Sequence, residues 1–154
     1  MQHQELFSEL SSAKATLHRS IEAIVQASDR YCETFPQSVK DGLPSYADAK
    51  SNASAAYYMY ATTLTYVLKS AEATLALLTP ISERANEKEL HEISEQCSEL
   101  ISAYETFSTE ALSPYFEASQ TLILSGGETI SLTPLYGATR ELQRKSEEFL
   151  GKLS

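Results

Sequence analysis

The stretch SNASAAYYMYATTLTYVLKSAEATLALLTPIS, residues 51–82, contains only two charged side chains, Lys69 and Glu72. Read at helical spacing, its apolar residues form an unbroken repeat of three and four. The residues of this repeat are Tyr57, Ala61, Leu64, Leu68, Ala71, Leu75 and Leu78. A helix that is apolar over so much of its circumference has to be covered by neighbouring elements. The stretch therefore predicts the central helix of an all-α fold.

Turn-forming and helix-breaking residues divide the rest of the chain into further amphipathic helices, because proline cannot extend a helix but fits its first turn after a Ser or Thr cap. The breaks are Pro36, Asp41-Gly42, Thr79-Pro80, Ser113-Pro114 and Thr133-Pro134. The expected helices are 4–35, 46–78, 80–112, a short one at 114–124, and 134–152. They predict a single domain, 1–154, that forms an elongated antiparallel up-down bundle of three long helices and a shorter C-terminal one, like a four-helix bundle.

Two regions leave alternatives open. The expected apolar seam of the first helix is Phe7, Leu10, Leu17, Ile21, Ile24, Tyr31 and Phe35. Lys14 and Ser28 interrupt this seam, and Ala13 and Ala27 beside them offer a small apolar alternative. Around Gly126-Gly127, the flanking segments 121–124 and 129–132 fit either a small hairpin or an irregular loop.

Charge and hydropathy exclude several classes of partner. A net charge of -9 argues against nucleic acid and anionic membrane surfaces, since both need a basic patch. Residues 51–68 are uncharged over nearly a membrane-spanning length, but their Asn, Ser and Thr content favours a buried helix over a span.

The N-terminus lacks the pattern of a secretory signal, so we expect a cytoplasmic protein. Cys32 and Cys97 lie on apolar helix faces and are interpreted as reduced core thiols.

No catalytic, metal-binding or nucleotide-binding motif is present in the sequence. His91 lies between Glu87 and Glu95 on one helix face, but Lys88 stands where a di-iron Glu-x-x-His motif needs glutamate, which favours a solvated row of charges. His18 is expected to point to solvent. We therefore predict no cofactor, no metal and no enzymatic activity.

The nine tyrosines, with no tryptophan, are the least usual feature. They fit a core lined by phenol, Ser and Thr hydroxyls, a partner-facing patch, or a small-molecule pocket. The leading hypothesis is a protein-protein interaction module, an adaptor or subunit of a homo-oligomer or hetero-oligomer, whose central helix is left partly uncovered. The expected interface residues are Tyr46, Ala49, Tyr57, Tyr58 and Tyr60.

Two other functions remain open from the sequence. One is a ligand-binding or catalytic bundle with a closed pocket that places Tyr60 or Tyr104 near a titratable group. The other is an acidic secretion chaperone or secreted effector, which would share the small size and the isoelectric point near 4.8.

Overall fold

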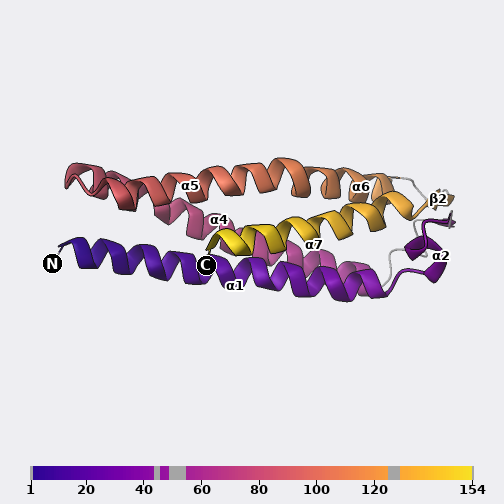
Figure 1. Cartoon of the computed structure of the whole chain (residues 1–154). Helices are drawn as coiled ribbons and strands as arrows, with labels where there is room; N and C mark the ends of the chain where they lie inside the picture. The colour runs from indigo at the N-terminus through magenta and orange to yellow at the C-terminus, as the bar shows by residue number, and fades with distance from the viewer. Residues whose placement is uncertain (1, 44–45, 49–54, 125–128, 154) are drawn as a thin grey trace.

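The computed structural model describes residues 2–43, 46–48, 55–124 and 129–153, and within them the chain is an elongated helical bundle (Figure 1). The helices are α1 (Gln2–Glu33), the short α2 (Gln37–Lys40), α4 (Ala55–Glu87), α5 (His91–Phe107), α6 (Ser113–Leu124) and α7 (Thr133–Leu153), and a π-helical turn (Ser108–Leu112) joins α5 to α6. The all-α bundle predicted from the sequence is confirmed, and the first and last helices lie within two residues of their expected bounds.

The long helices run alternately up and down the bundle. Helix α1 lies between α4 and α7, and the α5–α6 rod closes the other side, so α4 and α7 face each other diagonally. Helix α7 is shorter and ends about halfway along α1 (Figure 1). The bundle therefore has four helices near the α2 end and three at the opposite end.

The second long helix does not end at Thr79-Pro80 as expected, because α4 continues through Pro80 to Glu87. Its actual end carries no glycine or proline. Glu89 takes the left-handed conformation with φ 59°, and the backbone N–H of Leu90 donates to the carbonyl of Ala85 at 2.8 Å. This is the hydrogen-bond pattern that terminates a helix after a left-handed residue. The expected start at residue 46 is also wrong, since α4 begins at Ala55.

The third long helix, expected at 80–112, begins only at His91. The short helix expected at 114–124 is found as α6, but a π-helical turn joins it to α5 without a break before Pro114. The π-helical turn just before this proline holds one extra residue, which shifts the buried side of the helix by one position. Phe107 and Ala111 are buried before the shift, and Leu112 and Tyr115 after it. Pro114 consequently stays on the exposed side, and Tyr115 enters the core.

A two-stranded antiparallel pairing lies at the α2 end of the bundle. Strand β1 (Tyr46–Asp48) pairs with β2 (Thr129–Ser131), with Tyr46 opposite Ser131 and Asp48 opposite Thr129. Of the two alternatives left open around Gly126-Gly127, the hairpin is wrong, because residues 121–124 belong to α6 and the partner of β2 comes from far earlier in the chain. Three residues per strand are too few for independent stability, so the helices must hold this pairing in place.

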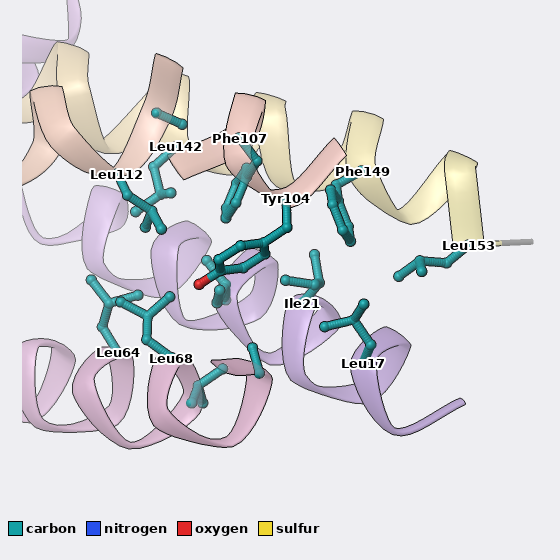
Figure 2. Packing of buried hydrophobic residues seen from close by; sticks show 14 of the residues in the cluster. Leu17, Ile21, Leu64, Leu68, Tyr104, Phe107, Leu112, Leu142, Phe149 and Leu153 are labelled. Atoms are coloured by element: carbon teal, nitrogen blue, oxygen red, sulfur yellow. The ribbon is translucent and has the colours of Figure 1, made fainter. Parts of the chain in front are cut away.

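The core runs the length of the bundle. Figure 2 shows Leu17 and Ile21 of α1, Leu64 and Leu68 of α4, and Phe149 of α7 on different sides of Tyr104, all within the space enclosed by the helices. Fully burying such a side chain stabilises the fold by about 1.5–3 kcal/mol. None of the described helices combines the length and the hydropathy needed to cross a bilayer.

The seam of α1 differs from the expected one at its first residue, and at its two interruptions the buried residues are Ala13, beside Lys14, and Ser28 itself. Leu6 is buried in place of Phe7, whose side chain is 52% exposed. Ser28, which interrupted the apolar pattern, is fully buried.

Candidate functional site

A cluster of buried tyrosines joins α1, α4 and α6. Tyr31 of α1 stacks on Tyr60 of α4 with ring centroids 4.6 Å apart, and Tyr60 meets Tyr115 of α6 edge to face at 5.7 Å. Tyr57 of α4 lies 6.2 Å from Tyr31. Such aromatic pairs add about 0.5–1.5 kcal/mol to the effect of burial. The cluster therefore ties three helices together.

Serine hydroxyls satisfy two of these phenols. The hydroxyls of Tyr60 and Ser28 lie 2.8 Å apart, and those of Tyr57 and Ser119 lie 2.6 Å apart. Burial raises the pKa of Tyr60 well above its ordinary value, against the opposing hydrogen bond from Ser28. The interpretation of the tyrosines as part of a hydroxyl-lined core is confirmed for Tyr57 and Tyr60.

This arrangement separates the residues expected at an interface. Tyr57 and Tyr60 are only 5% and 4% exposed, so their expected place on an uncovered surface is corrected, whereas Tyr58 is 57% exposed. The reason is that α1 and α6 supply both ring partners and hydroxyl partners on that side of α4. Tyr46 belongs to β1, and Ala49 lies outside the described residues.

The uncovered side of α4 is nevertheless apolar. Tyr58, Met59, Tyr66 and Leu77 are 57%, 71%, 76% and 59% exposed. We define the outer face of α4 as these four residues together with the exposed Thr62, Thr65, Lys69, Ala73, Ala76 and Pro80. Tyr66 and Leu77 were missed as surface residues, although both lie outside the three-and-four repeat that marked the buried side.

Two grooves follow the line where α4 meets α1, beside the outer face. One, of about 420 Å³, has Ala13, Leu77 and Pro80 in its lining together with the ion pair of Glu9 and Arg84. The other, of about 220 Å³, is lined in part by residues of the tyrosine cluster and by Met59. These two grooves offer space beside the outer face for apolar side chains of a binding partner.

The hypothesis of a closed core pocket stays a prediction. Figure 2 shows Tyr104 reaching from its helix into the core, near Leu68 and Ile21. Its hydroxyl is buried without a hydrogen-bond partner among the described residues. Burial, and secondarily the charge of Glu72, raises the pKa of Tyr104 to about 12. The phenol of Tyr104 is therefore neutral at pH 7.

Tyr115 is the second buried phenol whose hydroxyl lacks a hydrogen bond within the described chain. Burial raises the pKa of Tyr115, and the nearby Ser119 opposes that effect. The Ser119 hydroxyl is already engaged at 2.6 Å with Tyr57. Of its two tyrosine neighbours, Ser119 is thus hydrogen-bonded to Tyr57.

The remaining nucleophilic and ligating groups are dispersed. His18 lies 3.5 Å from Glu22, and His91 is exposed. Nowhere in the described ranges do three His, Cys, Asp or Glu side chains gather as metal ligands. Cys32 and Cys97 are buried free thiols, as expected, and burial raises the pKa of Cys32 to about 11.

No protein-family model, curated protein or solved structure matches this chain.

Proposed function

We propose that this chain is a non-enzymatic helical interaction module that binds a protein through the outer face of α4. The observation that carries the proposal is the row of exposed Tyr58, Met59, Tyr66 and Leu77 along one side of a single helix. Tyrosine and methionine are enriched at protein interfaces. Exposed apolar area continuous over such a length marks an interaction site more often than a solvated surface.

The charge distribution supports the same surface. The chain has 21 acidic and 12 basic residues, yet residues 55–82 contain only Lys69 and Glu72 as charged side chains. By contrast, the outer side of α7 carries Arg144 in ion pairs with Glu141 and Glu148 at 2.6 and 2.8 Å. Depletion of charge is typical of the centre of an interface. Helix α4 thus presents a surface poor in charge, whereas α7, which lies diagonally across the bundle from it, presents a charged one.

Site-specific photo-crosslinking in the source cell tests the proposal. A benzophenone amino acid replaces the exposed Tyr66 in one variant and the exposed Glu147 of α7 in the matched control. We expect discrete protein adducts from position 66 and few from position 147, because only the first position lies within the outer face. Circular dichroism of both variants is compared with the wild type, and we expect unchanged helix content.

Equal crosslinking at both positions would overturn the proposal, since it would report random collisions rather than a docked partner. Adducts from position 66 that disappear when Met59 and Leu77 are both replaced by Glu would support it. Both of these side chains are more than half exposed, so the substitutions remove apolar surface without opening the core.

A further inference from the structure

We infer that the partner of this chain is an acidic amphipathic helix that lies lengthwise along the junction of α1 and α4 and anchors two apolar side chains, 18 positions apart, in the two grooves beside the outer face. The inference rests on the proposed function and names the chemistry of the partner. Two observations carry it: the grooves repeat along both helices with one period, and the charges beside them are basic in an acidic chain.

The two grooves are related by a shift of 18 residues. The α1 residues that line the larger groove are Glu9, Ser12, Ala13 and Thr16. Each of the four α1 residues that line the smaller groove stands 18 positions after one of these. The relation holds on α4 as well, where Met59 lines the smaller groove and Leu77, 18 positions later, lines the larger one. Both helices therefore set the same separation, about 27 Å at 1.5 Å per residue.

This separation matches the period of an α-helix. Eighteen residues make five full turns at about 3.6 residues per turn, so positions i and i+18 of a straight helix point to the same side. One helix aligned with the junction can therefore place an apolar side chain in each groove. An extended segment would instead leave its backbone N–H and C=O groups unpaired beside the apolar outer face.

An arginine borders each groove. In the larger groove, Glu9 neutralises the charge of Arg84, but the buried Nε of Arg84 has no hydrogen-bond acceptor among the described residues. In the smaller groove, Arg30 is exposed and forms no ion pair within the described chain. Guanidinium groups donate to carboxylates in strong, charge-assisted hydrogen bonds. We therefore expect Asp or Glu in the partner close to each apolar anchor.

The stretch between the grooves is also flanked by cations. At 100° per residue, Arg19 and Lys69 lie about 70° and 100° around their helices from the middle of the groove lining, whereas Glu22 and Glu72 lie about 130° and 160° from it. Arg19 and Lys69 are exposed, and neither has an ion-pair partner in the described ranges.

The charge along the junction differs from that of the rest of the molecule. The chain carries a net charge of -9, and residues 91–124 include glutamates but no lysine or arginine. A locally basic junction on an acidic protein favours a partner segment of negative charge, because complementary potentials steer and orient association.

Photo-crosslinking at two positions 18 residues apart tests the geometry. A benzophenone amino acid replaces Met59 in one variant and Leu77 in another, which are 71% and 59% exposed and line different grooves. Adducts formed in the source cell are digested, and mass spectrometry identifies the modified residue of the partner. We expect both variants to modify one segment of one protein, at sites about 18 residues apart to within a turn of helix, with a net negative charge between them.

Charge reversal tests the chemistry of the partner. In the Met59 crosslinking variant, Arg30→Glu with Lys69→Glu should lower the adduct yield about tenfold, because two cations that face the acidic partner become anions. Lys88→Glu with Lys152→Glu is the matched control, since both lysines are exposed, lie away from the junction and give the same change in net charge. We expect the control to keep the wild-type yield and all variants to keep the wild-type melting temperature.

Modified sites at another spacing, sites in two different proteins, a basic segment between the sites, or equal yields from the two charge reversals would overturn the inference. Sites in the sequence of this chain itself would do so as well, because they would identify a second copy as the occupant. Adducts from Tyr66 without adducts from Met59 and Leu77 would overturn the inference and leave the proposed function standing. Absence of adducts from all three positions would remove both.

Discussion

The hydroxyl of Tyr60 on α4 lies 2.8 Å from the hydroxyl of Ser28 on α1, inside the core. Ser28 is one of the two residues that interrupt the apolar seam of α1, and it is fully buried. A serine at this position is explained by the phenol that it satisfies, because an unpaired buried hydroxyl costs about 1–3 kcal/mol. The polar Ser28 in the apolar seam of α1 is therefore explained by Tyr60 on α4.

Ser28→Ala should destabilise the protein by about 1–3 kcal/mol, because it leaves the buried Tyr60 hydroxyl without a partner. Tyr60→Phe should cost less, since a serine in a helix can turn to a backbone carbonyl of the preceding turn. Urea unfolding of both single variants and the double variant measures the coupling. Strictly additive effects would contradict a direct bond between the two hydroxyls.

Tyr104→Phe should leave stability unchanged or raise it by up to about 1–3 kcal/mol, because the hydroxyl it removes has no partner within the described residues. Tyr57→Phe is the matched control and should destabilise, since its hydroxyl lies 2.6 Å from that of Ser119. Calorimetry compares the two melting temperatures. A clear loss of stability in Tyr104→Phe would show that this hydroxyl has a polar partner after all.

Pro80→Ala should stabilise α4, because proline inside a helix removes one backbone hydrogen bond and clashes with the carbonyl four residues earlier. The gain should approach about 3 kcal/mol. Pro134→Ala is the control, since Pro134 stands in the first turn of α7, where the missing N–H is not needed. Chemical denaturation checks both, and equal effects would argue against the continuous helix through Pro80.

Glu89→Gly should stabilise the turn between α4 and α5 by up to about 1 kcal/mol, because glycine adopts the left-handed conformation of φ 59° without a steric cost. Glu87→Gly, at the last residue of α4, should instead destabilise by a similar amount. The two substituted positions lie two residues apart in the sequence, and thermal unfolding compares the stabilities of the two variants. The reverse order of stabilities would place the helix end elsewhere.

Stability should fall as the pH rises above about 10. Burial raises the pKa of Tyr31, Tyr60, Tyr104 and Tyr115 above the ordinary value of 10.0. The unfolded chain therefore loses these protons at lower pH than the folded one, which favours unfolding in alkali and has no effect below about pH 9. Urea unfolding between about pH 8 and pH 11, with tyrosinate absorbance, measures the change. A constant free energy of unfolding over that range would falsify the burial of these phenols.

The sequence by itself determined that the chain is an all-α bundle of amphipathic helices, because the period of apolar residues is a local property of the chain. The bounds of α1 and α7 followed from it, as did the buried positions Leu64, Leu68 and Ala71. The same reasoning placed Cys32 and Cys97 correctly in the core.

Only the tertiary structure decided which of the adjacent tyrosines lie inside. Helix α4 is apolar over most of its circumference, so its own pattern does not say where its neighbours stand. Tyr57 and Tyr60 are buried because Ser119 and Ser28 lie opposite them, and Tyr58 is exposed because no described element covers that side. Likewise Pro80 stays helical because the burial of its neighbours in the sequence, Leu78 and Ile81, outweighs a local cost of about 3 kcal/mol. Burial and partners are properties of the assembled bundle, and no window of sequence contains them.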